Sequence, residues 1–164
     1  KAGSILVTRF EYARFLLDTN AVSGIGQTRR ASKFFRQRVL MPDEVLYECR
    51  GATDFSEFSS QVFPTTPRVL QRVAEVMSTV EANDFDLVDL YKNEGGADPL
   101  LIACALAAEE ANEPSLFGFN WAIVSNDRAV QRKAREFHVQ VMDVPSFTKL
   151  IDRSQRGLDA NELG

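Results

Sequence analysis

The sequence predicts an α/β domain in which helices flank a parallel sheet of about four or five strands, a three-layer arrangement. Short apolar runs, typical of buried strands, alternate along the chain with longer segments of helical periodicity. Strands joined through helices are usually parallel, and a parallel sheet needs helices on both faces. The 164 residues, 45% of them hydrophobic, are enough for one well-cored domain and leave little room for two.

Three segments carry the strand signal. The first runs from Arg14 to Asp18 and ends in polar turn residues, and the others span Trp121–Ser125 and Val139–Met142. The segment Val39–Met41 is too short to assign. The stretch Thr53–Thr65 is rich in Ser, Thr and Phe without a clean period, so we expect a loop or a short helix there.

The helices are expected from capping residues and from apolar periodicity. Pro42, followed by acidic residues, opens one helix, and Thr66 with Pro67 opens another. The apolar residues of this second helix recur at helical spacing and are predicted to be core: Val69, Leu70, Val73, Val76, Met77 and Val80. The expected helices span residues 28–38, 42–50, 66–80, 84–91, 99–110, 126–137 and 146–151.

The chain divides into an ordered domain and two flanking segments. Residues 1–13 read as a tag remnant or N-terminal extension, residues 14–151 as the domain, and residues 152–164 as a polar tail expected to fray. No run reaches the roughly 20 apolar residues that cross a bilayer, and no signal peptide is recognisable. Cys49 and Cys104 lie in apolar helical patterns, so we expect reduced, buried thiols in a cytoplasmic protein without contact with a membrane.

Positive charge is concentrated in one segment, although the net charge is −4. That total argues against a protein that coats nucleic acid with its whole surface. Residues 29–38 contain five cations and no acid, and residues 128–135 contain a second basic run. Four cations of the first run are the candidates for contact with RNA phosphates: Arg29, Arg30, Lys33 and Arg36. The alternative for both runs is an ordinary solvated helix face.

Several acidic residues lie at positions where a parallel sheet is expected to bring separate chain segments together. Asp18 and Asp127 follow two strands whose carboxyl ends share one edge of a parallel sheet, where ligands bind. Asp98 begins a buried helix, and Glu48 borders the core positions of another. Such a cluster is stable when a divalent cation neutralises it, and all-oxygen ligands favour Mg²⁺ or Mn²⁺. The alternatives are turn and capping roles for Asp18, Asp98 and Asp127, and Glu44 in place of Glu48.

Four segments together resemble the acidic motifs of one nuclease family. They are Phe15-Leu-Leu-Asp-Thr-Asn-Ala-Val22, Met41-Pro-Asp-Glu-Val-Leu-Tyr-Glu48, Gly95-Gly-Ala-Asp-Pro-Leu-Leu-Ile-Ala-Cys-Ala-Leu106 and Trp121-Ala-Ile-Val-Ser-Asn-Asp127. In this order they are similar to the motifs of PIN-domain nucleases, particularly small prokaryotic VapC-like toxins or a related branch. The resemblance covers Arg14 to Ile151.

The resemblance implies a fold, an activity and partners. The fold would be PIN-like, and the activity that of an endoribonuclease dependent on Mg²⁺ or Mn²⁺. Its catalytic and metal-binding residues would be Asp18, Glu48, Asp98 and Asp127, with Asn20 and Ser125 in supporting polar positions. The partners would be RNA, a second copy in a homodimer and an inhibitory antitoxin protein.

Other functions are weighed against this one. A phosphotransferase of the haloacid dehalogenase type needs a second Asp two residues after the first, where this chain has Asn20. A response-regulator receiver needs paired acids before the end of the first strand, and they are absent at the expected place. A PIN-like scaffold or RNA-binding module that has lost catalysis stays open as the alternative function.

Overall fold

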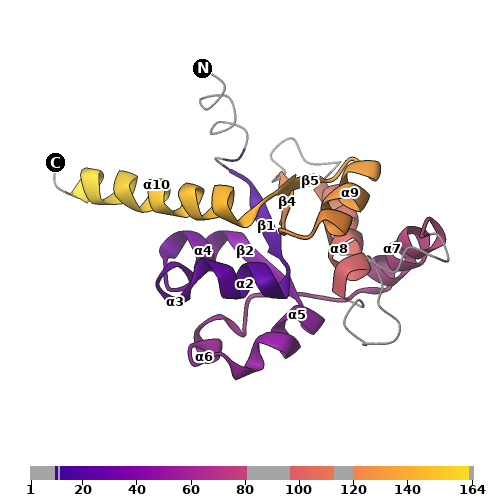
Figure 1. Cartoon of the computed structure of the whole chain (residues 1–164), viewed down its shortest axis with the longest axis horizontal. Helices are drawn as coiled ribbons and strands as arrows, with labels where there is room; N and C mark the ends of the chain where they lie inside the picture. Colours follow the sequence, from indigo (N-terminus) through magenta and orange to yellow (C-terminus); the bar gives the residue numbers. More distant parts are fainter. Residues whose placement is uncertain (1–9, 11, 81–96, 113–119, 163–164) are drawn as a thin grey trace, which may run out of the picture.

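Five parallel strands form one sheet in the order β3-β2-β1-β4-β5 (Figure 1). The computed structural model describes residues 10, 12–80, 97–112 and 120–162, excluding the side chains of residues 97, 98 and 158–162. The strands are β1 (Arg14–Leu17), β2 (Val39–Pro42), β3 (Val62–Phe63), β4 (Trp121–Val124) and β5 (Gln140–Met142). In the register, Phe15 of β1 lies opposite Val39 of β2 and Ala122 of β4. The predicted three-layer α/β fold with a parallel sheet is confirmed.

The central strand β1 is buried on both of its faces. Phe15 and Leu17 enter one apolar cluster and Leu16 enters the other, and none of the three is solvent-exposed. The first cluster is covered by α2 (Thr19–Ile25), α4 (Lys33–Arg38), α5 (Asp43–Glu48) and α10 (Val144–Glu162). The second is covered by α7 (Pro67–Ser78), α8 (Ala97–Asn112) and α9 (Arg128–Glu136). Strands buried on both faces explain why their sequences are continuous apolar runs.

Besides Asp143, which accepts the Ser146 N–H in the first turn of α10, four side chains just before helices cap them. Each cap residue accepts a hydrogen bond from a backbone N–H of the first turn, which satisfies a donor without an intrahelical partner. These residues are Asp18 before α2, Ser32 before α4, Thr66 before α7 and Asp127 before α9. Between α2 and α3 (Gln27–Arg30), Gly26 has a φ of +83°, a conformation that favours glycine.

Two segments that the sequence left unassigned form regular secondary structure. The segment after Arg38 is β2, and the stretch expected as a loop or short helix contains both α6 (Phe55–Phe58) and β3. β3 consists of only Val62 and Phe63, which pair with β2, so it is too short to show a strand period in the sequence. A 3₁₀ turn, Cys49–Gly51, finishes the helix that was predicted to begin at Pro42.

Two expectations were wrong, one about which residues of α7 are buried and one about where α10 ends. Leu70 and Met77 of α7 are 57% and 38% exposed, whereas Val69 and Val76 form the buried stripe. The segment after Ile151, expected to fray, continues α10 to Glu162. An ion pair helps to hold this extension, because Asp152 binds Arg29 of α3 with two hydrogen bonds of 2.8 and 2.9 Å.

The remaining features concern the cysteines, membrane spans and the undescribed segments. Cys49 and Cys104 are buried free thiols, as predicted. Within residues 10, 12–80, 97–112 and 120–162, no helix combines the length and apolar character needed to cross a membrane. The helix predicted over residues 84–91, and most of the N-terminal extension, lie outside the described residues.

Candidate active site

The candidate site lies at the carboxyl edge of the sheet, between β1 and β4. From β1 the chain continues toward β2 over one face, whereas from β4 it continues through α9 over the other face. Leu17 lies opposite Val124 in the register, so Asp18 and Ser125 leave the sheet side by side. Such a switch point opens a crevice in parallel α/β sheets and is the usual ligand site.

Asp18 is a buried carboxylate held in place by hydrogen bonds. Only 8% of the residue is exposed, and Oδ1 accepts the Ala21 N–H at 2.7 Å. Burial raises the pKa of Asp18 above its ordinary value, and the nearby carboxylates of Asp127 and Glu48 raise it further. Hydrogen bonds from the Ser125 hydroxyl and from Ala21 oppose this rise. Three of the predicted acids therefore influence one another at this edge.

Glu48 reaches the site from the end of α5. Its Oε2 accepts a hydrogen bond of 2.6 Å from the hydroxyl of Thr19, the residue after Asp18. Glu48 is exposed, although its place beside the core positions of the helix had suggested a half-buried side chain. Glu44, the competing acid one turn earlier, is also exposed and has no hydrogen bond to a described residue. The contact with Thr19 therefore favours Glu48 over Glu44.

The loop after β4 supplies Ser125 and Asp127. Ser125 is fully buried, and its Oγ accepts the Asp127 N–H at 3.0 Å. Asp127 is exposed, and its Oδ1 accepts the N–H groups of Ala129 and Val130 at 2.7 and 3.3 Å. The capping role considered for Asp127 is therefore present, and no described group binds its second oxygen.

The other predicted polar positions are less well defined. Asp98 is the second residue of α8, and its side chain lies outside the described residues. Asn20 is exposed on α2 and makes no hydrogen bond with a described group. Among the described side chains, no three acids, cysteines or histidines lie close enough together to hold one metal ion. The contribution of Asp98 is thus decisive for a metal centre.

The chemistry of the cluster nevertheless fits a hard divalent cation. Asp18, Glu48 and Asp127 offer carboxylate oxygens only, and none of them forms an ion pair with a described lysine or arginine. Several carboxylates without a cation are costly in a buried site, and Mg²⁺ or Mn²⁺ prefers such ligands.

Cys49 neighbours the acids but is unsuited to nucleophilic chemistry. Burial, followed by the negative charge of Glu48, raises the pKa of this thiol to about 11. Only the thiolate is strongly nucleophilic, so the thiol is inert near neutral pH. The candidate site therefore offers carboxylate chemistry rather than thiol catalysis.

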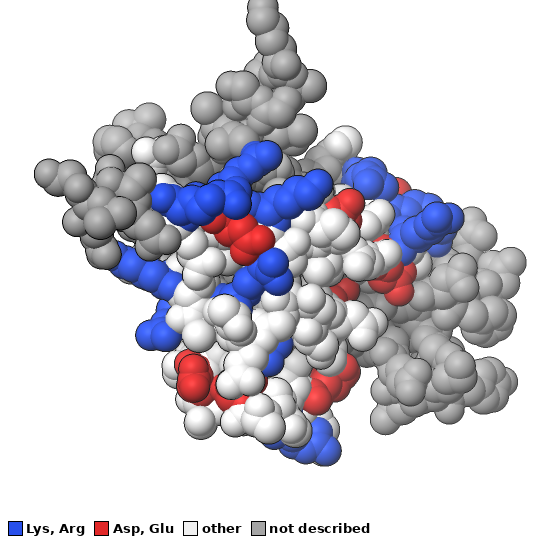
Figure 2. All heavy atoms as spheres, turned by 60° about the vertical axis from the view of Figure 1, so that its left-hand side comes forward, with Lys and Arg blue, Asp and Glu red and all other residues white. Residues whose placement is uncertain are grey.

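The predicted RNA contacts of residues 29–36 divide into paired and exposed cations. Arg29 pairs with Asp152, and Arg30 is almost buried in an ion pair with Asp54. Lys33 and Arg36 are exposed, and Arg36 donates to the carbonyl oxygen of Ala31. Figure 2 shows several cations along the upper part of this side of the molecule, with carboxylates beside them, and other cations at its middle, left edge and lower end. Arg30 therefore has a structural role that the sequence did not indicate.

Three polar residues that support the site were missed from the sequence. Thr19 donates to Glu48, and Gln131 Nε2 donates to the carbonyl oxygen of Ser125 at 2.8 Å. Asn126 Oδ1 accepts the Val144 N–H at 2.9 Å, which ties the β4 loop to α10. Thr19 and Asn126 each follow a strand-end polar residue, a signal that could have identified them. Gln131 carries no such signal, because it lies within a helix.

The chain was compared with known proteins. No protein-family model matches it, and no curated protein matches it.

Proposed function

We propose that this chain is a metal-dependent endoribonuclease of the PIN type. The observation that carries the proposal is that the carboxylates of Glu48 and Asp127, from separate elements, lie near enough to the buried Asp18 at the β1–β4 switch point to raise its pKa. The four motifs quoted above supply the family, and the strand order with its flanking helices is compatible with it. The toxin role, the antitoxin and the homodimer are proposed on the resemblance alone.

The hydrogen bonds around the acids support a role in holding a cation. One oxygen of Asp18 is fixed by Ala21, and one oxygen of Glu48 is fixed by Thr19. Asp127 is likewise held by the first turn of α9. Carboxylates whose orientation is fixed lose less conformational freedom when they bind a ligand.

The chemistry follows from a cation shared by these side chains. Asp18, Glu48, Asp98 and Asp127 would hold Mg²⁺ or Mn²⁺, which when bound polarises a phosphodiester and promotes the ionisation of water. Asp18 and Ser125 would define the buried wall of the site, whereas Glu48 and Asp127 would border its open side. RNA would enter from that exposed side.

The experiment compares neutral replacements that keep side-chain shape. Asp18→Asn and Glu48→Gln should each lower the cleavage of single-stranded RNA with Mn²⁺ by about a hundredfold or more. Glu44→Gln is the matched control, because Glu44 is an exposed acid on the same helix without a contact to the cluster, and it should cleave normally. RNA binding by Asp18→Asn should be equal or slightly tighter, since a repulsive charge is removed.

Three results would contradict the proposal. Normal cleavage by both Asp18→Asn and Glu48→Gln would place the chemistry elsewhere. A wild-type protein that binds RNA but cuts none of a broad RNA pool with Mg²⁺ or Mn²⁺ would be an RNA-binding module or an inactive scaffold. A protein that neither binds nor cuts RNA would act on a substrate of another class.

A further inference from the structure

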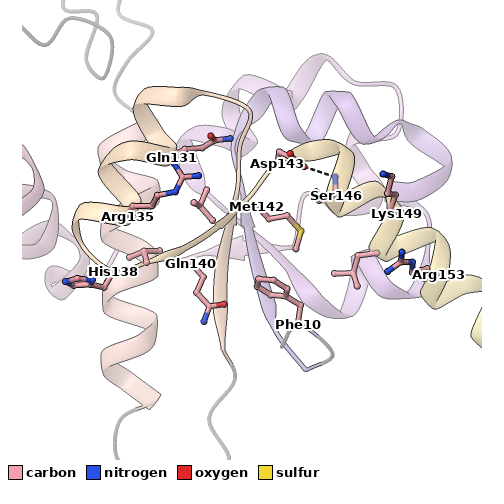
Figure 3. Close-up of a pocket in the computed structure, with 13 residues that line it drawn as sticks. Phe10, Gln131, Arg135, His138, Gln140, Met142, Asp143, Ser146, Lys149 and Arg153 are labelled. Atoms are coloured by element: carbon pink, nitrogen blue, oxygen red, sulfur yellow. Dashed lines mark hydrogen bonds between the residues drawn. The ribbon is translucent and has the colours of Figure 1, made fainter. Parts of the chain in front are cut away.

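A groove of about 780 Å³ runs along the outer side of β5, and none of the predicted site acids lines it. Its walls come from α9 on one face of the sheet and from α10 on the other, with β5 between them (Figure 3). A groove lined from both faces lies at the edge of the sheet. The edge strand is therefore the floor of this groove.

The backbone of β5 has hydrogen-bonding groups to offer along this edge. Among the described residues β5 pairs only with β4. The carbonyl oxygen of Met142 accepts the Ser125 N–H, so the backbone of Met142 faces β4. Successive residues of a strand direct these groups to opposite sides, and the N–H and C=O of Val141 therefore point into the groove. Unpaired groups of this kind are a template for a further strand.

The walls combine an apolar base with a cationic rim. Phe10, Met142 and Leu150 line the groove on the α10 side. Three exposed cations stand around it, and none forms an ion pair with a described residue: Arg135, Lys149 and Arg153. The single acid of the lining, Asp143, accepts the Ser146 N–H at 2.8 Å. The rim is therefore complementary to negative charge.

A buried acceptor adds to this picture. Oε1 of Gln140, which lines the groove, is inaccessible to solvent and has no hydrogen-bond partner in the described part of the chain. A buried acceptor without a donor costs free energy.

We propose that this groove binds an extended, acidic segment of a partner protein, which adds as a strand to the free edge of β5. Its backbone would pair with Val141, its apolar side chains would pack near Met142 and Leu150, and its carboxylates would meet the cationic rim. RNA fits less well, because phosphates would satisfy the cations but leave the strand edge and the apolar base unused. The groove contains none of the predicted nuclease acids, although Gln131, which binds the Ser125 carbonyl oxygen, also lines it.

The test uses a panel of short fluorescent peptides in which Glu or Asp alternates with Val, Ile or Leu. A matched panel carries Lys or Arg in place of the acids. Fluorescence anisotropy with the full chain should show micromolar binding for members of the acidic panel and at least tenfold weaker binding for the basic panel. Binding should weaken as salt increases, because the rim charges are exposed.

Two kinds of variant identify the site. Val141→Pro removes the N–H that points into the groove but none of the bonds to β4, so it should weaken binding at least tenfold, whereas Val141→Thr should bind normally. Arg135→Glu combined with Arg153→Glu should also weaken binding at least tenfold, and these surface changes leave the core intact. Circular dichroism and thermal unfolding check each fold. Asp18→Asn should bind the peptides like the wild type, whatever its effect on RNA cleavage.

Four outcomes would overturn the proposal. The first is equal binding of acidic and basic peptides, and the second is undiminished binding by the double charge reversal. The third is wild-type dimerisation, seen by sedimentation and lost in Val141→Pro, which would make a second copy the occupant. The fourth is binding of a uridine oligonucleotide that the charge reversal abolishes and Val141→Pro preserves, in the absence of peptide binding.

Discussion

Arg30 belongs to a basic segment that is typical of an exposed helix face, yet its side chain is largely buried. Its guanidinium binds both oxygens of Asp54 at 2.8 and 2.9 Å and donates to the Val22 carbonyl at 2.8 Å. Its Cζ also lies 5.6 Å from the centre of the Phe58 ring. The Arg30 side chain is only 10% exposed and that of Asp54 only 2%. This pair joins α3 to the start of α6.

Arg30→Ala should therefore destabilise the fold rather than act on RNA binding alone. Removing one partner leaves the buried Asp54 carboxylate uncompensated, which typically costs about 3 to 5 kcal/mol. Lys33→Ala is the matched control, since this exposed cation has no partner in the described part of the chain and should stay within about 0.5 kcal/mol of the wild type. Urea unfolding measures both. A loss below about 1 kcal/mol for Arg30→Ala would contradict the structural role.

At the scale of helices, the carboxylate before α9 has a different role for each of its two oxygens. Asp127 caps the helix through Oδ1, while its second oxygen remains available to the candidate site. At the other end, His138 adopts a φ of +58°, and the Val139 N–H returns to the Ala134 carbonyl. This is the pattern of a Schellman motif, here with a histidine in the position that usually holds glycine. Both ends of α9 are thus fixed by local hydrogen bonds.

Substitutions at Asp127 should separate capping from catalysis. Asp127→Asn keeps a capping oxygen and should change stability little, whereas Asp127→Ala should lose about 1 kcal/mol. If the second oxygen serves the nuclease, both variants should lose RNA cleavage. Thermal unfolding and the cleavage assay are measured on the same samples. Full cleavage by Asp127→Asn would restrict this residue to its capping role.

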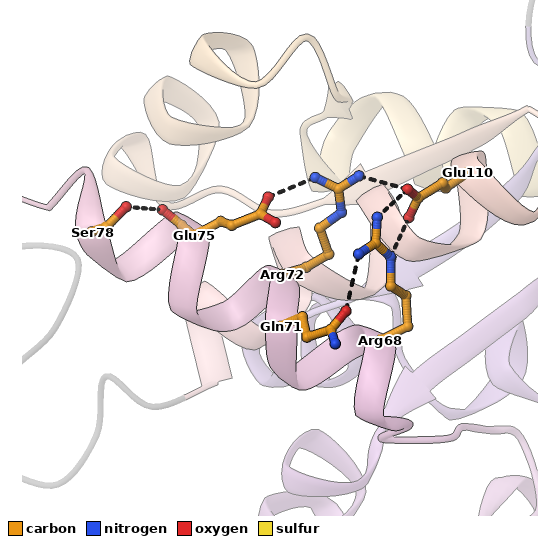
Figure 4. Close-up of polar contacts among 6 residues, drawn as sticks. All are labelled: Arg68, Gln71, Arg72, Glu75, Ser78 and Glu110. Carbon is orange, nitrogen blue, oxygen red and sulfur yellow. Dashed lines mark hydrogen bonds and ion pairs between the residues drawn. The ribbon is translucent and has the colours of Figure 1, made fainter.

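The contact between α7 and α8 is reinforced by a charged network at its surface (Figure 4). Glu110 of α8 accepts hydrogen bonds from Arg68 and Arg72, both on α7, and Arg72 also binds Glu75. These bonds lower the pKa of Glu110 to about 2, with Arg68 the larger cause. The neighbouring Glu109 has no such partner among the described residues, and partial burial raises its pKa.

The two neighbouring acids should affect stability with opposite dependence on pH. Ionised Glu110 stabilises the fold above pH 4.5, its ordinary pKa, and this contribution is lost as pH falls toward 2. Glu110→Gln should therefore be less stable than the wild type at pH 7, with a difference that shrinks below pH 4.5. Glu109→Gln should be equally or more stable at pH 7, because ionised Glu109 is disfavoured by burial. Chemical unfolding across this pH range measures both, and equal behaviour of the two variants would contradict the assignment.

For the whole molecule, a shared cation would couple three elements of the fold. A ligand at a hundredfold excess over its dissociation constant adds about 2.7 kcal/mol to the free energy of unfolding. For a chain of this size, that corresponds to a rise of roughly 5 to 10 °C in the thermal midpoint. Mn²⁺ should therefore raise the midpoint of the wild type, and EDTA should reverse the rise.

The same measurement on variants assigns the effect to the acidic cluster. Asp18→Asn should lose most of the rise with Mn²⁺, because a buried ligand charge is removed. Without metal it should be slightly more stable than the wild type at pH 7, because burial penalises the ionised Asp18. Glu44→Gln should keep the full rise. An equal rise in all three proteins would locate the ion outside the cluster.

The sequence by itself determined the layers of this protein and the place of its strand ends. Buried strands must be apolar on both faces, and helix caps need particular side chains, so β1, β4, α7 and α9 were readable from local patterns. The positions of Asp18 and Asp127 at one edge followed from the parallel order. Glu48 was chosen because it borders core positions of its helix and fits the spacing of the family that the motifs resemble, and its contact with Thr19 agrees with that choice.

The tertiary structure alone decided which distant residues meet. The pairing of Arg30 with Asp54, the short strand β3 and the exposure of Leu70 depend on neighbours remote in sequence. The extension of α10 beyond Ile151 likewise accompanies an ion pair between Asp152 and the distant Arg29. The free edge of β5 exists because that strand has only β4 beside it among the described residues. Local periodicity specifies which face of an element is apolar, whereas charge pairing and strand edges depend on how the elements pack against one another.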